Sequence, residues 1–448
     1  MDQLFGTDGI RGLAGEFPLD ENTIRKVGAS LARQYAENLG RDPRFVTGRD
    51  TRESGEWIER AFYAGAASEG AVCESAGVIT TPGVAYLTRA FDFDAGVVIS
   101  ASHNPCHDNG IKVFTPNGKK IDEMTEHLIE ADVFETAEST GCLDDPGLEP
   151  LRSDEFRTAY LAHLRETAGE FSAAGLKIVI DCANGAATGL ASKLLENLGA
   201  EVISINCDPD GRNINENCGS THLGSLQQKV VESNADLGVA FDGDADRALF
   251  VDEQGEVVDG DVTLWIVAQY LKAHGKLASS TVVATVMSNI GLELALKSKE
   301  IKLLRTDVGD KYVLEKLLDT GSEIGGEQSG HIIFPAISLV GDGMMTALLL
   351  LHAINELGVS LSAATAGFVK YPQTLKNVKV REKLPFVELP EVVELSKQIE
   401  SELHGHGRLL LRYSGTENLA RVMIEGKDQA EIESQAKRLA NVILANLG

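Results

Sequence analysis

The sequence is short of basic residues. Its 448 residues include 41 Lys and Arg against 67 Asp and Glu, which gives a formal net charge of -26 at pH 7. A surface this acidic repels nucleic acids and anionic membranes, so we expect neither as a partner. An anionic substrate would have to be held by basic residues gathered locally, which makes the arginines and lysines inside motifs informative.

Long apolar runs and paired cysteines are also missing. The longest apolar runs, such as 347–351, are far too short to cross a bilayer, and the N-terminus has no basic-then-apolar signal pattern. None of the six cysteines forms a Cys-x-x-Cys pair, which favours reduced thiols. These absences predict a cytoplasmic protein.

A phosphate loop for nucleotides is absent as well. The pattern Gly-x-x-x-x-Gly-Lys-[Ser/Thr] occurs nowhere in the chain. If the protein transfers phosphoryl groups, their source must therefore be something other than a nucleotide held in such a loop.

Strand and helix patterns alternate along most of the chain, which is typical of α/β proteins. The length suggests three or four domains. A linker-like Asp-Asp-Pro-Gly at 144–147 follows an acidic stretch, and the pattern of strands and helices changes after Pro372. We expect three α/β domains and a smaller α+β domain, over 1–153, 154–256, 257–370 and 371–448.

The stretch 96–114 has the strongest functional character. A short apolar strand at 97–99 ends in small and polar residues, among them Ser100, Ser102, His103 and Asn104, with Lys112 close behind. Ligand sites in open α/β sheets lie at the carboxyl ends of strands. Ser102 is therefore a candidate nucleophile or phosphoryl carrier, although an ordinary Ser/Asn/Pro turn explains the same residues.

Three carboxylates follow another predicted strand, at 237–241. They are Asp242, Asp244 and Asp246, spaced by small residues so that all three can point at one centre. Their mutual repulsion is costly unless a cation neutralises it, and hard oxygen ligands suit Mg²⁺ or Ca²⁺. A solvated acidic turn is the alternative. Arg247, next in the chain, can pair with one of the acids or reach a phosphate.

A glycine-rich loop at 325–331 carries Glu327, Ser329 and His331. These side chains can exchange hydrogen bonds with the hydroxyls of a polyol, but a plain hairpin fits the segment equally well. Near the N-terminus, three glycines and Arg11 at 6–12 predict a loop whose backbone lies very close to a neighbouring group. A turn-rich segment is the alternative there.

The last motif lies at a predicted strand end near the C-terminus. Hydroxyls, a glycine and guanidinium groups make a good anion cradle, and a capped turn is the alternative. The residues are Arg412, Ser414, Gly415, Thr416 and Arg421. A serine, a metal loop, a hydroxyl-reading loop and a phosphate cradle together favour phosphoryl transfer.

These motifs resemble those of the α-D-phosphohexomutase superfamily. The resemblance rests on five segments in the expected order, which span the whole chain: Gly6–Gly12, Ser100–Lys112, Asp242–Arg247, Gly326–His331 and Arg412–Glu417. Two positions depart from the family pattern. Ala245 stands where glycine is commoner, and Cys106 with His107 stands where aromatic residues are frequent.

The resemblance implies a four-domain, heart-shaped architecture and a mechanism. A covalent phosphate on Ser102 would be transferred to a hexosamine phosphate, and the resulting hexosamine bisphosphate would return its other phosphate. One Mg²⁺ per subunit would be held by Ser102 and the three aspartates. His103 and Lys112 would transfer protons or stabilise charge, and Arg11 would position the phosphoserine.

The remaining roles implied by the resemblance concern the substrate. Glu327, Ser329 and His331 would read sugar hydroxyls, while Arg247 and the cradle Arg412, Ser414, Gly415, Thr416 and Arg421 would hold phosphate. The expected reaction converts glucosamine 6-phosphate to glucosamine 1-phosphate for UDP-N-acetylglucosamine and cell-wall precursors, with the bisphosphate as activator. Phosphomannomutase or phosphoglucomutase activity and a non-catalytic sugar-phosphate-binding protein remain alternatives, and a homodimer is left open.

Overall fold

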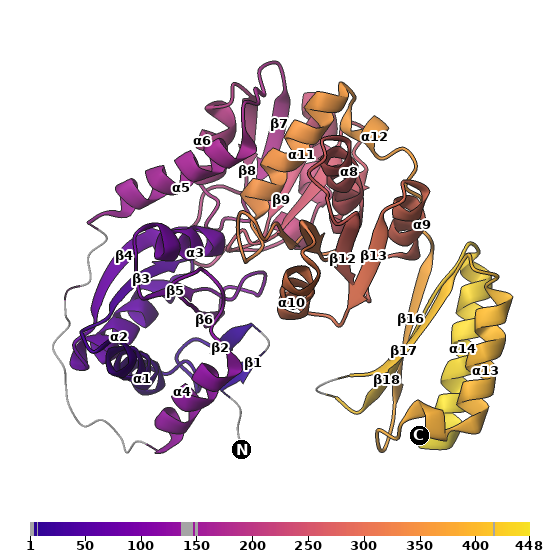
Figure 1. Cartoon of the computed structure of the whole chain (residues 1–448), viewed down its shortest axis with the longest axis horizontal. Coiled ribbons are helices and arrows are strands. Elements are labelled where there is room, and N and C mark those ends of the chain that lie inside the picture. Colours follow the sequence, from indigo (N-terminus) through magenta and orange to yellow (C-terminus); the bar gives the residue numbers. More distant parts are fainter. Residues whose placement is uncertain (1–3, 7, 136–146, 148–150, 415–416) are drawn as a thin grey trace. The chain divides into compact units, whose positions relative to one another are not determined.

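The computed structural model describes residues 4–6, 8–135, 147, 151–414 and 417–448. Its contacts divide the chain into two compact units. Figure 1 labels the helices and strands along the chain. The first unit runs to Thr285 and resumes over Thr306–Ala366, and the second comprises Val286–Arg305 and Gly367–Gly448. No helix of the described residues is both long and apolar enough to span a membrane.

The first sheet has six strands in the order β1-β2-β6-β5-β3-β4. Strand β3 pairs in parallel with β4 and β5, whereas β6 runs antiparallel to both β5 and β2. The strands are β1 (Phe5–Gly6), β2 (Gly9–Leu13), β3 (Arg44–Arg49), β4 (Val72–Val78), β5 (Ala95–Ile99) and β6 (Asp108–Phe114), and the helices are α1 (Glu21–Leu39), α2 (Gly55–Ser68), α3 (Thr81–Ala90) and α4 (Glu123–Glu135).

The strand predicted before Ser100 is confirmed as β5, which is buried along its whole length. The first helix, α1, is capped at both ends. Asp20 accepts a hydrogen bond from the Thr23 amide, and Gly40 ends α1 in the left-handed conformation. Ile24 and Val27 on its apolar face are fully buried.

The sequence predicted a loop near the N-terminus, and this prediction is wrong. The segment contributes strands β1 and β2. Phe5 and Ile10 carry large apolar side chains into the core, but the glycines around them make the two-residue period of a strand nearly invisible. The expected close backbone approach is real. A Cβ at Gly9 would lie 2.4 Å from the Ile111 carbonyl oxygen of β6, and Gly9 has a φ of +79°.

The second sheet has the order β11-β10-β9-β7-β8. Strand β7 pairs in parallel with β8 and β9, and β9 and β10 form an antiparallel hairpin in which Phe241 faces Ala248. The elements are α5 (Ser153–Ala168), β7 (Lys177–Asp181), α6 (Leu190–Glu196), β8 (Glu201–Ile205), η1 (Gly219–Thr221), α7 (Gly224–Ser233), β9 (Leu237–Phe241), β10 (Ala248–Asp252) and β11 (Val257–Val258).

The rest of the first unit is built around β12, which pairs in parallel with β14, while β14 and β15 form an antiparallel hairpin. The glycine-rich loop at 327–331 connects these last two strands, so a hairpin is indeed its backbone form. The elements are α8 (Gly260–Ala273), β12 (Thr281–Thr285), α10 (Asp310–Thr320), β14 (Ile324–Gly326), β15 (Ile332–Ile333), α11 (Gly343–Leu357) and α12 (Leu361–Ala364).

The second unit contains α9 (Ile290–Ser298) and nearly all of β13 (Lys302–Thr306). Its C-terminal part is the small α+β fold that the sequence predicted, an antiparallel sheet in the order β16-β18-β17 with its own apolar core. The elements are β16 (Gln373–Lys379), η2 (Phe386–Glu388), α13 (Pro390–Glu402), β17 (Arg408–Tyr413), β18 (Leu419–Glu425) and α14 (Gln429–Leu447).

The cysteines that the structure describes are free, as expected. Cys73, Cys182 and Cys218 are buried, while Cys106 and Cys207 are partly exposed. Cys142 and most of the linker-like 144–147 lie outside the described residues.

A buried carboxylate begins α11. Asp342 accepts hydrogen bonds from the Met345 amide at 2.9 Å and from the Tyr160 hydroxyl at 2.8 Å. Burial raises the pKa of Asp342 from 3.8 to about 6, although both hydrogen bonds oppose the shift. A folded-state pKa above the ordinary value favours the protonated form, so the stability from that proton is complete below about pH 4 and is lost as the pH rises through 6.

Asp342→Asn carries no titrating proton, yet asparagine is an equally good N-cap. We expect the free energy of unfolding of the variant, relative to that of the wild type, to rise by up to about 3 kcal/mol between about pH 4 and pH 8. The melting temperature of the variant should rise relative to that of the wild type over the same range. Differential scanning calorimetry across this range checks the expectation. A difference in melting temperature that does not change with pH would contradict it.

Candidate functional site

Ser102 lies just beyond the carboxyl end of β5, in the loop that leads into β6. It is buried and has a φ of +53°, a left-handed conformation that is unusual for a residue other than glycine. Its hydroxyl donates a hydrogen bond of 2.6 Å to Oδ2 of Asp242 and lies 3.3 Å from Nδ1 of His103. The structure therefore brings the predicted serine to the predicted acidic loop.

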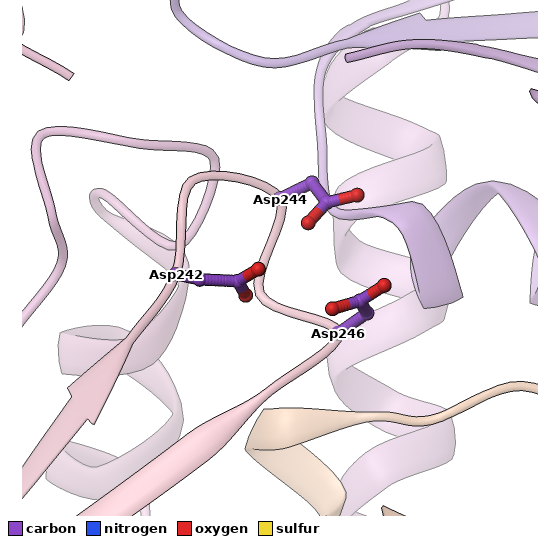
Figure 2. Close-up of side chains that lie close together, drawn as sticks. All are labelled: Asp242, Asp244 and Asp246. Atoms are coloured by element: carbon purple, nitrogen blue, oxygen red, sulfur yellow. The ribbon is translucent and has the colours of Figure 1, made fainter. Parts of the chain in front are cut away.

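The three aspartates occupy the connection between β9 and β10 and point toward one another (Figure 2). All three are buried, and one ligand atom of each lies within 4.8 Å of the others. The turn is closed by a hydrogen bond from the Ala245 amide to the Asp242 carbonyl, and Ala245 has a φ of +55°. Such a φ suits glycine best, which gives a physical reason why glycine is the commoner residue at this position.

These carboxylates fit a hard divalent cation. Oδ1 of Asp244 and Oδ1 of Asp246 are buried and have no hydrogen-bond partner among the described residues. Burying three anions together is costly, and oxygen-only donors are what Mg²⁺ and Ca²⁺ prefer. The aspartates would hold the ion, and the nearby Ser102 hydroxyl is available as a further oxygen donor. A solvated acidic turn is excluded by the burial of the group.

Lys112 partly neutralises the acidic loop. Its ammonium lies 2.9 Å from Asp244, 3.5 Å from Asp246 and 3.1 Å from Asp8. Burial would lower the pKa of Lys112, but these carboxylates outweigh burial and hold its pKa well above the ordinary value. One ammonium cannot balance so many carboxylates, so the group still favours a divalent cation.

The surroundings shift the pKa values of Asp242 and Asp246 in opposite directions. Burial, reinforced by the charges of Asp246 and Asp244, raises the pKa of Asp242 well above its usual range. Burial alone would also raise the pKa of Asp246, but Lys112 and His331 hold it well below that range. Asp244 is fixed by the first residue of α3, since the Thr81 hydroxyl donates to its Oδ2 at 2.6 Å.

The structure places His103, Arg11 and Arg247 near Ser102. Nδ1 of His103 lies 3.3 Å from a guanidinium nitrogen of Arg247, whose backbone amide donates to Asp242 at 3.2 Å. Arg11 donates to the Ala101 carbonyl at 3.3 Å and pairs with Asp8. Burial, with the charges of Arg247 and Arg11, lowers the pKa of His103.

The three polar residues of the β14–β15 hairpin are not equivalent. Glu327 accepts hydrogen bonds from the Gly309 amide at 3.2 Å and the Ser329 hydroxyl at 3.1 Å. His331 is instead buried against the acidic loop, with Nδ1 3.6 Å from Asp246. Burial would lower the pKa of His331, but the carboxylates of Asp246 and Asp310 outweigh it and raise the pKa.

Several charged residues at this site were missed by sequence reasoning. Lys120 bridges Asp8 and Asp310, 2.6 Å from the latter, and Asp8 in turn contacts Lys112. The charges of Lys112 and Lys120 outweigh burial and hold the pKa of Asp8 well below its usual range. Asp8 lies inside the Gly6–Gly12 motif and Lys120 follows the Ser100–Lys112 motif, but no pattern along the chain pairs positions so far apart.

The predicted phosphate cradle belongs to the second unit. Arg412 of β17 lies directly opposite Arg421 of β18, and Arg421 also reaches the Ser414 hydroxyl at 3.5 Å. Like charges at opposed positions destabilise a sheet, and Nε of Arg421 is buried without a partner among the described residues, so the pair favours an anion. Gly415 and Thr416 lie outside the described residues.

Comparison with known proteins accounts for nearly the whole chain. Four family models match, described as the phosphoglucomutase/phosphomannomutase alpha/beta/alpha domains I, II and III and C-terminal domain, over residues 2–140, 158–255, 259–371 and 375–442. Curated relatives named phosphoglucosamine mutase include those of Solibacter usitatus, 49% identical over 99% of both chains, and Deinococcus deserti, 48% identical over 98% of both.

Solved structures share the fold at lower identity. A phosphoglucomutase/phosphomannomutase family protein from Burkholderia thailandensis aligns with a TM-score of 0.78 and 22% identity, covering 99% of this chain and 98% of the other. A phosphomannomutase described as putative, from Thermus thermophilus, aligns with a TM-score of 0.76 and 23% identity over 98% of both chains.

Asp244→Asn should weaken the binding of Mg²⁺ or Mn²⁺ by at least about tenfold, because loss of even a ligand's hydrogen-bond partner costs 10- to 100-fold in other metal sites. Isothermal titration calorimetry with each ion measures the affinity. Asp252→Asn is the matched control, since Asp252 is a buried carboxylate at the far end of the same hairpin. Equal affinities of the wild type and Asp244→Asn would refute the metal assignment.

Proposed function

The chain belongs to the phosphoglucomutase/phosphomannomutase family, and we propose that it interconverts glucosamine 6-phosphate and glucosamine 1-phosphate. The observation that carries the proposal is the buried Ser102 hydroxyl, hydrogen-bonded at 2.6 Å to the acidic loop. Relatives about half identical over their full length and named phosphoglucosamine mutase support the choice of substrate.

In the proposed reaction, Ser102 carries a covalent phosphate. The bond between phosphorus and Ser102 Oγ breaks as a bond forms between phosphorus and a hydroxyl of the hexosamine phosphate, which yields a bisphosphate. The bisphosphate then returns its other phosphoryl group to Ser102, so no phosphoryl group is lost. A Mg²⁺ ion held by Asp242, Asp244 and Asp246 would supply positive charge to the transferring group.

The protein's own groups have distinct parts in this proposal. His103, with Nδ1 3.3 Å from Ser102 Oγ, is placed to exchange the proton of the reacting hydroxyl. Lys112 is surrounded by carboxylates and serves as a fixed positive charge. Arg11, which donates to the Ala101 carbonyl, positions the phosphorylated loop, and Arg247 offers a guanidinium to a phosphate.

Substrate recognition is proposed to use two groups of residues. Glu327 and Ser329, which are linked to each other on one hairpin, read sugar hydroxyls. His331 supports that hairpin from its contact with Asp246. The phosphate that is not reacting is held by the cradle, Arg412, Ser414, Gly415, Thr416 and Arg421.

Further features come from the family resemblance or from the sequence pattern and stay proposals. They are one Mg²⁺ per subunit, activation by hexosamine bisphosphate, a cytoplasmic location without nucleic-acid or membrane partners, a homodimer as the assembly, and a four-domain division with boundaries after residues 153, 256 and 370. The family's name also covers glucose and mannose phosphates, so those substrates are the second candidates.

A coupled assay on the 6-phosphates of glucosamine, mannose and glucose tests the function. We expect the highest kcat/KM for glucosamine 6-phosphate and a loss of at least about 1,000-fold in Ser102→Ala, because the covalent carrier is removed. Intact mass should show one phosphoryl group on active wild type and none on Ser102→Ala.

Ser68→Ala is the control, because Ser68 is exposed on α2 of the same unit. Turnover by Ser102→Ala at the wild-type rate would contradict the phosphoserine mechanism. A higher kcat/KM for mannose or glucose 6-phosphate would instead show that the proposed substrate is wrong, and it would leave the phosphoserine mechanism standing.

A further inference from the structure

A second ion pair, fully buried beneath the Ser102 loop, has no part in the reaction described above. Asp50 and Arg52 follow β3, and neither side chain has any exposed area. From this pair we infer that Arg52 is a positioning residue for Ser102: it holds the loop backbone in the conformation that presents Oγ to the acidic loop. The inference rests on the proposed function, since it assigns Arg52 a role in that reaction.

All five N–H groups of the Arg52 guanidinium can be matched to acceptors. Nε donates to Asp50 at 2.8 Å. One terminal nitrogen donates to the carbonyls of Ser102 at 3.0 Å and Asn104 at 2.8 Å. The other donates to the carbonyls of Asp108 at 2.9 Å and Pro105. Four carbonyls of the 102–108 loop are thus held by one planar group.

Asp50 holds the amide side of Ser102 through the Ser100 hydroxyl. Its Oδ2 accepts from the Ser100 hydroxyl at 2.6 Å, and the Ser100 oxygen in turn accepts from the Ser102 amide at 3.0 Å. The amide and carbonyl of Ser102 are therefore both tied to the Asp50–Arg52 pair. This explains how a serine is kept at a φ of +53°, which is costly unless the surroundings enforce it.

Asn215, which lies between β8 and β9, also binds the Ser102 loop. Its amide nitrogen donates to the Ser102 carbonyl at 2.9 Å and to the Asn104 carbonyl at 3.0 Å, the same two acceptors that Arg52 uses. The acidic loop also packs against this point, because a Cβ at Gly243 would lie 2.5 Å from the Ser102 carbonyl oxygen. The position of Ser102 relative to the aspartates is thus set through its carbonyl.

Because Arg52 has no exposed area, it cannot touch the substrate, and its effect should appear in the transfer step alone. Arg52→Lys keeps the charge beside Asp50 but offers one nitrogen with three donors in place of the five-donor fork. A displacement of about 1 Å at a reacting group costs about a hundredfold in rate. We therefore expect kcat to fall by about a hundredfold, with no rise in KM.

The test compares purified wild type, Arg52→Lys and Arg49→Lys. Arg49→Lys is the matched control, because it is the same substitution at the end of the same strand and Arg49 pairs with Glu59 rather than with the Ser102 loop. The concentration of folded enzyme is taken from Mn²⁺-binding stoichiometry. The rate of Ser102 phosphorylation by glucose 1,6-bisphosphate is followed by intact mass, because a merely structural role would not slow this rate per folded molecule.

Asn215→Asp is the second variant and carries the test if Arg52→Lys does not fold. Aspartate tolerates the φ of +60° at this position, but it turns a donor into an acceptor facing two carbonyls. It should also lower kcat and the phosphorylation rate without raising KM. A kcat within threefold of wild type in every folded variant of the two overturns the inference. A wild type with no mutase activity overturns the proposed function itself, and the inference falls with it.

Discussion

Electrostatic repulsion among three buried carboxylates is the constraint on which the rest of the site depends. Asp242, Asp244 and Asp246 place one ligand atom each within 4.8 Å of the others, in a chain whose surface is already strongly acidic. Lys112 and the Ser102 hydroxyl offset part of this repulsion, and two carboxylate oxygens have no hydrogen-bond partner among the described residues. A site built in this way is suited to concentrating positive charge around a phosphoryl group.

The fold brings these groups together through strand ends. Ser102 follows β5, and the aspartates connect β9 to β10 in a different sheet of the same unit. The two loops are held together at the Ser102 carbonyl. This carbonyl accepts hydrogen bonds from Arg52 and Asn215, and it lies so close to Gly243 that a side chain at position 243 would not fit. Rigid support of this kind lets one serine hydroxyl be placed to within hydrogen-bonding distance of one carboxylate.

Much of this could be read from the sequence, because apolar runs and turn residues mark the strands and loops locally. The strands at 97–99 and 237–241 were predictable in this way. The strand at Gly9–Leu13 was not, since its glycines hide the alternation. Nor were Arg52, Asn215, Lys120 and Asp310, because their importance lies in contacts with residues up to 190 positions away.

The central claim is that Ser102 carries the phosphoryl group between substrate and product. Its most direct test is to incubate the protein with radiolabelled hexose 1,6-bisphosphate, digest it and map the labelled peptide. The account predicts label on the peptide containing Ser102, and its release into a bisphosphate when unlabelled glucosamine 6-phosphate is added. Label on another residue, or label on Ser102 that the substrate cannot discharge, would contradict it.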